Sequence, residues 1–453
     1  MSGGPIDGCV GAGAAVLNFS LVSFWTLLPA DVLAAIFVAV LVWAGRREWK
    51  FLLIGAVAGG GIGIALTWWF GDVKGLLGIP PTLVDRSWAI AAFAGLGIAI
   101  VIVIRKRWVF RILAGLAVIC FFVAGGLAIN RDGGLFPHVS DVLGVSNMPA
   151  LKLSALVSHA PGTAFDAQLY RAWVPPTNLP RSGKFGTVAI PGVISHFNAR
   201  SAIVYLPPAA LVPNPPALPV LIVMSGQGPG AAPYNVVNAG HFVTTMNRIA
   251  EADHGLAPIV IIPDQLRSPT NNPMCVNGPL GNSATYLTVD LPRWIRAHFR
   301  VETGPRAWAI AGFSEGGTCA VQLAAKHPNL FGSFIDVSGQ QGPELGSVHA
   351  TIERGFRGSV TAYRAAQPIR IMQQHGLYTH TNAFISAGQN DSRYGPALPV
   401  IAAAAKRDGM HVTTFVVPGA SHDWAAAARG LAHGALWLQP RDGLAPPDST
   451  RAH

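Results

Sequence analysis

Four long apolar stretches near the start of the chain constrain its fold more than any other feature. Residues 27–44, 51–70, 88–104 and 108–129 are almost free of charged side chains. Each is close to the roughly 20 residues that an apolar helix needs to cross the hydrocarbon core of a membrane. Buried core helices seldom occur four in succession at this length. The sequence therefore predicts an α-helical membrane domain of four transmembrane helices over residues 1–130.

The charged residues between these stretches predict how the helices are oriented. Arg46, Arg47 and Lys50 lie between the first and second stretches, and an Arg-Lys-Arg run at 105–107 lies between the third and fourth. Basic loops remain on the cytoplasmic side of a membrane. We therefore expect a multi-pass protein of the cell membrane whose residues after 129 are extracytoplasmic. The interior of the stretches carries no Lys, Arg, Glu or His, which disfavours a transporter.

Composition supports a membrane protein and disfavours other classes. Charged residues make up 12% of the 453 residues, whereas an average soluble protein has about 25%. The net charge is +10, but the basic residues form no stripe with interleaved aromatics, so we expect no nucleic-acid partner. The sequence has no CxxC or HExxH motif, so we expect neither a metal nor a cofactor. Nothing in the sequence indicates the oligomeric state.

A mixed α/β pattern follows a connector at residues 131–184. Strands rich in β-branched residues are predicted at 185–190, 202–206, 220–224, 259–262, 307–311, 333–337, 382–386 and 412–417. Helices are predicted at 235–252, 289–299, 315–326, 396–407 and 424–437. This alternation is typical of a mostly parallel sheet with helices on both faces. We assign residues 185–439 to this domain and expect a disordered tail at 440–453.

A Gly-Phe-Ser-Glu-Gly sequence at residues 312–316 lies where a predicted strand meets a predicted helix. A GxSxG sequence in this context indicates the nucleophile elbow of an α/β-hydrolase, in which a strained turn projects the serine above the sheet. The serine is Ser314. The pattern therefore predicts an α/β-hydrolase domain that acts by nucleophilic catalysis.

A serine nucleophile needs a general base, and the base needs an orienting acid. In this fold the chain order is serine, acid, histidine. His422 lies in a loop after the last predicted strand, and Asp391 lies in a loop after the strand before it. Asp336 and Asp408 are the rival acids. We predict Ser314, Asp391 and His422 as the catalytic residues.

Two backbone N–H groups are expected to form the oxyanion hole. One is that of Glu315, the residue after the nucleophile. The other comes from the Ser-Gly-Gln-Gly-Pro-Gly loop at 225–230, where Gln227 is our choice and Gly228 its neighbouring alternative.

These motifs resemble those of a known family. Ala-Ile-Val-Tyr-Leu-Pro-Pro at 202–208, Gly-Phe-Ser-Glu-Gly-Gly at 312–317 and Gly-Ala-Ser-His-Asp-Trp at 419–424 are similar to the esterase family that includes esterase D and the actinobacterial antigen 85 mycolyltransferases. The resemblance covers residues 186–437, and the helical first part is similar to a membrane-anchored actinobacterial branch. It implies ester cleavage or acyl transfer through an acyl-serine. The acid here is an Asp rather than the Glu of antigen 85, which disfavours mycolyl transfer.

Three functions remain open at this point. The first is a membrane-anchored serine esterase acting on acyl or aminoacyl esters, with a lipid or small amphiphilic ester as its substrate. The second is an acyltransferase that passes the acyl group to a sugar or lipid acceptor. The third is a non-catalytic membrane scaffold that binds lipids.

Other residues near the serine have two interpretations each. The carboxylate of Glu315 either packs sideways against the sheet or, with Asp423, attracts a cationic group on the substrate; Trp424 is a second candidate substrate contact. Cys275 and Cys319 are either two free thiols or a disulfide, which an oxidising exterior permits.

Overall fold

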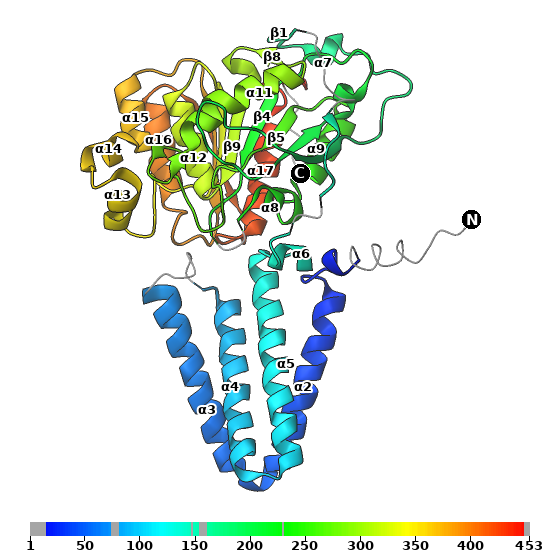
Figure 1. Ribbon diagram of the computed structural model, residues 1–453, viewed down its shortest axis with the longest axis vertical. Coiled ribbons are helices and arrows are strands. Elements are labelled where there is room, and N and C mark those ends of the chain that lie inside the picture. Colours follow the sequence, from blue (N-terminus) through cyan, green and yellow to red (C-terminus); the bar gives the residue numbers. More distant parts are fainter. Residues whose placement is uncertain (1–14, 74–80, 146–147, 154–160, 229–230, 448–453) are drawn as a thin grey trace. The chain divides into compact units, whose positions relative to one another are not determined.

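The structure is a computed structural model that describes residues 15–73, 81–145, 148–153, 161–228 and 231–447. Figure 1 labels its elements. The chain divides into two compact units, Met1–Asn147 and Met148–His453, which we call the helical unit and the sheet unit. The domain boundary predicted at residue 130 lies within a helix that continues to Gly133. The predicted connector is therefore divided between the two units.

The helical unit consists of long apolar helices. They are α2 (Phe24–Gly45), α3 (Trp49–Leu66), α4 (Leu83–Arg105) and α5 (Trp108–Gly133), with the short elements η1 (Arg46–Glu48), η2 (Thr67–Val73) and α6 (Val139–Val142). Among the described residues, three helical stretches are long and apolar enough to cross a membrane: Phe24–Val73, Leu83–Arg105 and Trp108–Gly133. The first contains both α2 and α3, joined by one turn that carries Arg46 and Arg47. Four separate membrane crossings remain a prediction.

Glycines allow α3 and α4 to approach each other closely. Gly55, Gly59 and Gly63 recur every four residues along α3. A Cβ added at Gly59 would overlap the carbonyl oxygen of Phe93, and one at Gly97 would overlap that of Gly55. Small residues at this spacing are typical of helices that pack in a lipid environment, where close backbone contact replaces hydrophobic burial.

The sheet unit is built on eight strands in the order β12-β11-β10-β9-β4-β5-β3-β2. The six strands from β12 to β5 run parallel, and β3 and β2 are antiparallel to their neighbours. All eight predicted strands match the observed ones within two residues at each end. The strands are β2 (Lys184–Val188), β3 (Ala202–Leu206), β4 (Val220–Met224), β5 (Ile259–Ile262), β9 (Trp308–Phe313), β10 (Ser333–Val337), β11 (Asn382–Gly388) and β12 (His411–Val417).

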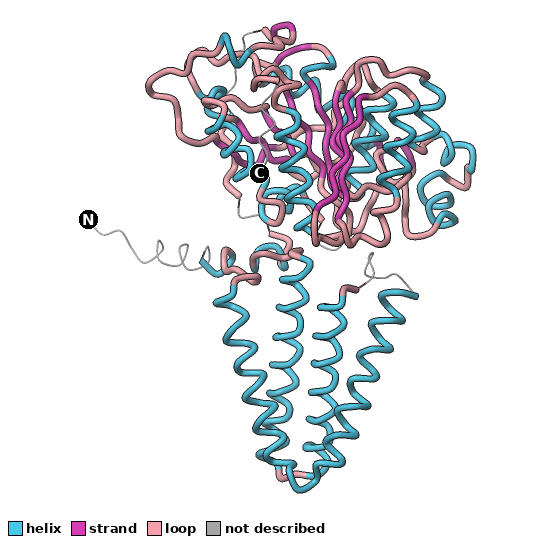
Figure 2. Tube along the Cα trace, turned by 180° about the vertical axis from the view of Figure 1, so that it is seen from behind, coloured by secondary structure: helices cyan, strands magenta, loops and turns pink. Residues whose placement is uncertain are grey.

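Helices cover both faces of this sheet (Figures 1 and 2). Side chains alternate across a strand, and β10 illustrates the result. Ile335 and Val337 contact Gly434 and Gly430 of α17 (Trp424–Leu438), whereas Asp336 points at α12 (Glu315–Lys326) on the opposite face. The central strands β4, β5, β9 and β10 are buried along their whole length. The α/β-hydrolase-like layering predicted from the sequence is therefore present.

The remaining elements connect the strands or extend the sheet unit at its edges. The predicted helix at 235–252 is two helices separated near His241, whose φ is +50°. Three helices after β10, namely α13, α14 and α15, are absent from our sequence prediction. The other helical elements are α7 (Leu169–Ala172), η4 (Pro208–Leu211), α8 (Pro233–Asn238), α9 (Phe242–Ala252), α10 (Ser283–Thr285), η5 (Tyr286–Asp290), α11 (Leu291–His298), η6 (Pro305–Ala307), α13 (Val348–Phe356), α14 (Val360–Ala365), α15 (Pro368–His375) and α16 (Ala397–Arg407). The short strands are β1 (Thr163–Ala164), β6 (Asn277–Gly278), β7 (Gly281–Asn282) and β8 (Glu302–Thr303).

The start of the predicted disordered tail is packed rather than free. Leu444 and Ala445 are buried, and the carbonyl of Gly443 accepts a hydrogen bond from the N–H of Tyr170 at 3.0 Å. These apolar side chains gain stability by leaving water, which the Pro-rich sequence alone did not indicate. Residues 448–453 lie outside the described residues.

Candidate active site

Ser314 lies on a strained turn between β9 and α12. Its φ of 56° and ψ of −117° are rare for a residue with a side chain. The turn closes tightly, because a Cβ at Gly312 would overlap the backbone of Gly316, and one at Gly316 would overlap the carbonyl oxygens of Met224 and Ser225. Both glycines of the GxSxG sequence are thus required by close backbone approach. The result is a serine at the carboxyl end of a central strand, at the N-terminus of a helix.

The structure brings the three predicted catalytic side chains together. His422 Nε2 lies 2.8 Å from Ser314 Oγ, and His422 Nδ1 lies 2.8 Å from Asp391 Oδ2. An ionised carboxylate only accepts hydrogen bonds, so Nδ1–H donates to Asp391 and Nε2 is left to accept from the serine hydroxyl. This arrangement leaves His422 able to take up the serine proton.

Asp391 is held in its ionised form by its hydrogen bonds. Burial alone would raise its pKa, but hydrogen bonds from His422 and from the backbone N–H groups of Tyr394 and Gly395 outweigh burial and lower the pKa. The Tyr394 N–H lies 2.8 Å from Asp391 Oδ1. The carboxylate is therefore both ionised and fixed in direction.

Aromatic rings hold the imidazole of His422 on two sides. Phe313 is stacked on it with ring centroids 5.0 Å apart, and the ring of Tyr394 lies 4.5 Å away. Trp424, expected to contact substrate, is 8% exposed and packs against Phe313 instead. Trp424 therefore packs against the ring of Phe313, which in turn stacks on His422. A contact between Trp424 and substrate remains a prediction.

The backbone groups expected in the oxyanion hole lie beside the serine. Glu315 is the first residue of α12, and the first N–H groups of a helix have no intrahelical acceptor. The loop that contains Gln227 approaches closely, because a Cβ at Gly226 would lie 3.3 Å from Ser314 Cβ. The side chain of Gln227 accepts a hydrogen bond from Asn272. Pro229 and Gly230 of the same loop lie outside the described residues.

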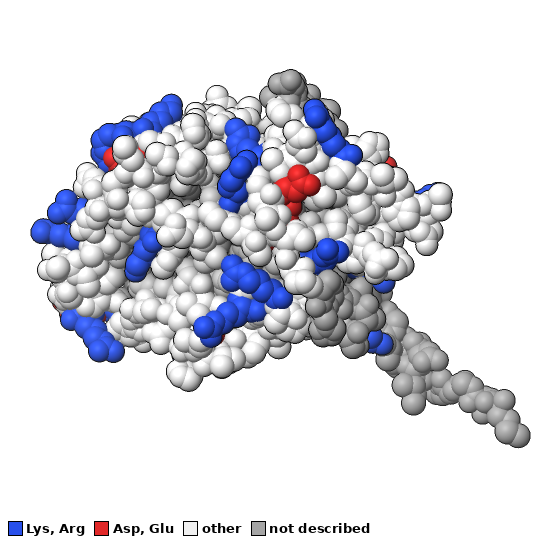
Figure 3. All heavy atoms as spheres, turned by 90° about the horizontal axis from the view of Figure 1, so that it is seen from above, with Lys and Arg blue, Asp and Glu red and all other residues white. Residues whose placement is uncertain are grey.

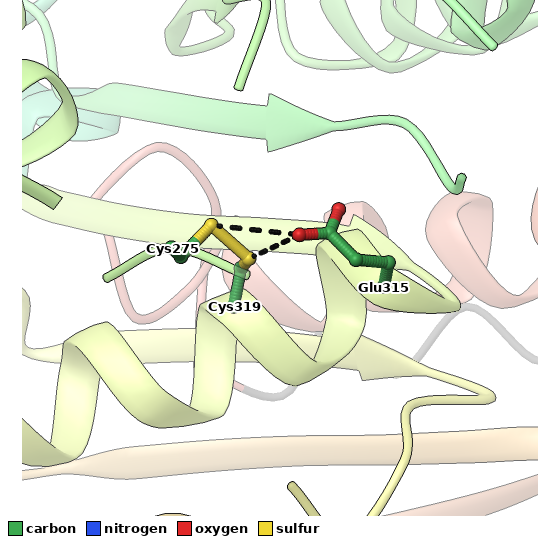
Figure 4. A group of neighbouring side chains, drawn as sticks. All are labelled: Cys275, Glu315 and Cys319. Carbon is green, nitrogen blue, oxygen red and sulfur yellow. Dashed lines mark hydrogen bonds between the residues drawn. A yellow bond between two sulfur atoms is a disulfide. The ribbon is translucent and has the colours of Figure 1, made fainter. Parts of the chain in front are cut away.

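The side chain of Glu315 points away from a substrate and into the protein. It is buried, and its Oε2 accepts a hydrogen bond from Gln265 at 2.9 Å. Its Oε1 lies 3.0 Å from Cys319 Sγ (Figure 4). Burial raises the pKa of Glu315 to about 7 despite the bond from Gln265. Of the two interpretations from the sequence, the geometry favours the carboxylate that packs sideways over the one that binds a substrate cation.

Asp423 has a structural role of its own in this geometry. Its two carboxylate oxygens accept hydrogen bonds from the N–H groups of Ala426 and Ser421, at 2.7 and 2.9 Å. The first of these bonds caps α17. Asp423 is therefore fixed in position by the start of α17, and its attraction for a substrate cation remains a prediction.

Cys275 and Cys319 form a disulfide next to Glu315. It joins the loop after β5 to the second turn of α12. Cys275, Glu315 and Cys319 also form the only group of three metal-ligand side chains found among the described residues. Because the two sulfurs are bonded to each other, neither is available as a thiolate ligand.

The rival acids of the sequence analysis lie elsewhere. Asp336 is fully buried against α12, accepts a hydrogen bond from Gly339 at 2.9 Å, and has its pKa raised by burial to about 7. Asp408 is paired with the neighbouring Arg407. Among the described residues, His422 is hydrogen-bonded to Asp391 and to neither of these two acids.

Sequence reasoning missed two residues that fix this site. Gln265 donates to the carbonyl of Ser225 at 2.7 Å as well as to Glu315, so it ties the loop after β4 to the nucleophile helix. Tyr394 fixes Asp391 and packs on His422. The available signal for Gln265 was its position three residues after a buried strand, at the edge where such sites form.

Fold and site together define the class: the sheet unit is an α/β-hydrolase with a serine, histidine and aspartate in line. The family model described as Putative esterase matches residues 198–431. The chain therefore belongs to this esterase family, which confirms the resemblance seen in the sequence.

Relatives of the chain match a little more than half of its length. An uncharacterized protein of Corynebacterium glutamicum is 36% identical over 256 residues, or 55% of this chain. The match spans 59% of that relative's length. An S-formylglutathione hydrolase from Agrobacterium tumefaciens is 21% identical, with a TM-score of 0.48. The match covers 58% of this chain and 97% of the hydrolase. MPT51 from Mycobacterium tuberculosis is 18% identical, with a TM-score of 0.41. The match covers 56% of this chain and 96% of MPT51.

Proposed function

We propose that the protein is a membrane-anchored serine esterase that cleaves acyl or aminoacyl esters of lipids through an acyl-serine intermediate. The observation that carries this proposal is the line of two 2.8 Å contacts from Asp391 through His422 to Ser314 on a strained elbow. Membership in the esterase family supports the same reaction class.

The geometry suggests a role for each residue. Ser314 Oγ attacks the ester carbonyl while His422 Nε2 removes its proton, and Asp391 stabilises the resulting imidazolium. The backbone N–H groups of Glu315 and Gln227 stabilise the oxyanion. His422 then gives its proton to the departing alcohol, leaving the acyl group on Ser314. Water attacks this acyl-serine with His422 again as base, which releases the acid and restores the hydroxyl.

The helical unit supports a lipid substrate and an extracytoplasmic site. Three helical stretches have the length and composition to cross a membrane, and a chain anchored in this way meets esters that are themselves in the membrane. Arg46, Arg47 and the basic run at 105–107 favour cytoplasmic loops at the same ends of these helices.

The reaction is tested with Ser314→Ala. We expect it to abolish ester hydrolysis and covalent labelling by a fluorophosphonate, because a triad member contributes several orders of magnitude in rate. Ser182→Ala, at an exposed serine, is the matched control and should retain both. Labelling that persists in Ser314→Ala would contradict the assignment of the nucleophile. Lipid profiles of membranes with each variant identify the substrate, and a new acylated product in place of free acid would indicate acyl transfer.

The orientation is tested with single added cysteines in the protein lacking Cys9 and Cys120, whose other two cysteines are bonded to each other. A cysteine at Lys50 should resist an impermeant thiol reagent added outside intact cells, whereas one at Asp72 should react. Lys50 lies in the first turn of α3, and Asp72 lies near the end of η2, which follows α3 directly. The reverse pattern would place the sheet unit in the cytoplasm and overturn the proposed compartment.

A further inference from the structure

A polar hollow lies at the same edge of the sheet as Ser314 and has no role in the mechanism above. Its volume is about 480 Å³, and its lining residues are Asn198, Ala199, Arg200, Arg267, Ser268 and Asn271. All but one of these residues have polar side chains, and two are arginines. It is formed by the loop before β3 and the loop after β5.

The sheet topology places this hollow near the nucleophile. Because β3 runs antiparallel to β5, the start of β3 and the end of β5 lie at the same edge. Strand β5 is separated from the serine strand β9 only by β4, so it is about 10 Å away at two strand spacings. Gln265, two residues before Arg267, reaches across this distance to Glu315. The hollow is therefore beside the active site and is connected to it by a hydrogen-bonded loop.

The two arginines differ in how their charge is balanced. Arg200 makes bonds of 2.9 and 2.8 Å to the two oxygens of Asp264, which is 1% exposed. This pair is neutral overall and forms a fixed wall. Arg267 is exposed and has no ion-pair partner among the described residues. The hollow thus carries one uncompensated positive charge.

The backbone around Arg267 is fixed. Its φ is +72°, a value that residues with side chains rarely adopt. The neighbouring Leu266 is held on both sides: its N–H donates to Asp264 at 3.1 Å, and its carbonyl accepts from Asn271 at 2.8 Å. Strained backbone of this kind persists only where its surroundings enforce it. The loop therefore presents Arg267 from a defined position.

We propose that this hollow binds a phosphate group of the substrate, so that the enzyme prefers esters that carry a phosphate near the scissile bond. A guanidinium presents paired N–H donors that match phosphate oxygens, and the amide of Asn198 and the hydroxyl of Ser268 are further donors at the same place. The proposal rests on the esterase activity proposed above and narrows its substrate class. The phosphate belongs either to a lipid headgroup or to a soluble ester.

Binding is measured first, apart from catalysis, on full-length Ser314→Ala in detergent. The probes are dihexanoyl phosphatidic acid, dihexanoylglycerol (which lacks only the phosphate) and inorganic phosphate. We expect the phosphatidic acid to bind at least about tenfold more tightly than the glycerol ester, and Arg267→Gln to remove roughly that factor. Equal binding of the two lipids would overturn the proposal. Displacement of the lipid by inorganic phosphate alone at similar concentration would assign the site to soluble phosphate esters.

Catalysis is measured next on the same pair of lipids with Ser314 intact. Arg267→Gln should raise KM for the phosphatidic acid about tenfold, leave kcat near its original value and leave the glycerol ester unaffected. Arg267→Lys should restore part of the loss, since it keeps the charge but not the paired donors. Because basic side chains are spread over the surface in Figure 3, Arg293→Gln, at an exposed arginine outside the hollow, controls for net charge.

The outcomes separate the two proposals. If Arg293→Gln causes the same loss as Arg267→Gln, general attraction explains the preference and the hollow is not a site. If wild-type protein hydrolyses neither lipid yet binds the phosphatidic acid through Arg267, the esterase proposal fails for these lipids while phosphate binding stands. If hydrolysis occurs without any dependence on Arg267, the esterase proposal stands and the phosphate site is overturned.

Discussion

Large apolar side chains face outward from the helical unit, whereas the central strands of the sheet unit bury theirs. Trp25, Ile54 and Trp108 are 79%, 63% and 69% exposed on their helices, while every residue of β3, β4 and β9 is buried. Inside the helical unit, the backbones of α3 and α4 approach closely at Gly55, Gly59 and Gly97. The sheet unit is instead crossed by side-chain hydrogen bonds that end at Ser314.

This difference shows what each unit requires from its surroundings. A helical bundle with an apolar exterior needs an apolar solvent, and its specificity comes from close backbone packing. The sheet unit has water as its solvent. Its catalytic atoms are held in place by buried strands and by loops that are hydrogen-bonded to one another. Changes that affect chemistry should therefore map to the sheet unit alone, and each unit should have its own unfolding transition.

The largest expected effect is that of Asp391→Asn on catalysis. The amide cannot hold His422 in the required tautomer, so kcat should fall by about 10³–10⁴. Hydrolysis of a p-nitrophenyl ester measures the loss, and both unfolding transitions should remain. Asp408→Asn, which removes the partly buried partner of the exposed Arg407, is the control. Full activity of Asp391→Asn would transfer the role of acid to another carboxylate.

Removal of the disulfide should destabilise only the sheet unit. Cys275→Ala with Cys319→Ala opens a link between residues 44 apart in sequence, and such links typically contribute 2–4 kcal/mol. Denaturant unfolding of the full protein in detergent should show the shift in the sheet-unit transition. Cys120→Ala, a buried thiol of the helical unit, should leave that transition in place. An unchanged transition in the double variant would mean that the bridge is dispensable.

A single methyl group should loosen the helical unit without changing catalysis. A Cβ at Gly97 meets the backbone of Gly55, so Gly97→Ala should cost about 1–3 kcal/mol in overpacking. A Cβ at Gly115 meets nothing within 4 Å, so Gly115→Ala should be neutral or slightly stabilising. Thermal unfolding in detergent compares the two. Equal stability of both variants would indicate that α3 and α4 do not pack through these glycines.

The smallest effect concerns pH and is again confined to the sheet unit. The pKa of Glu315 is raised from 4.5 to about 7 by burial, so the folded state holds its proton more tightly than the unfolded state. Its contribution to stability is complete below about pH 4.5 and is lost as the pH rises through about 7. Glu315→Gln should therefore stabilise the protein more at pH 8 than at pH 5, relative to wild type.

The control for this comparison is already present in the fold. Asp336 and Glu302 also have pKa values raised to about 7 by burial. The stability of wild type and of Glu315→Gln should therefore both depend on pH. The difference between the two curves of stability against pH isolates the contribution of Glu315. Glu315→Gln should also act equally on aminoacyl and neutral esters. A selective loss on aminoacyl esters would show that the carboxylate meets the substrate after all.

The sequence predicted those parts of the fold that depend on local pattern. The strands β3, β4 and β5 begin and end where their apolar runs do, because a strand buried on both faces is a nearly continuous run of apolar residues. The elbow at Ser314 was predicted for a similar reason, since its glycines are imposed by the turn itself. The loops that carry Asp391 and His422 were predicted from the order in which serine, acid and histidine occur along the chain in this fold.

The features that the sequence missed depend on distant partners. Helices α13, α14 and α15 are short, with six to nine residues each, too short to be stable without packing. Gln265 and Tyr394 lie on loops that follow different strands, and these loops meet the rest of the site only in the folded sheet. Leu444 is buried by contacts with a segment near residue 170, far away in the chain. None of these partners is visible in a local pattern.

The position of β12 has a consequence for how the site behaves over time. This outermost strand carries the loop of His422, and only Val417 of its seven residues is buried, whereas β9, which carries Ser314, lies between two other strands. Edge strands are the first segments to open locally, because fewer buried contacts hold them. We therefore expect the core around Ser314 to exchange most slowly and the edge segment next to His422 to open more readily. Brief local openings at the sheet edge would interrupt catalysis while the rest of the molecule stays folded.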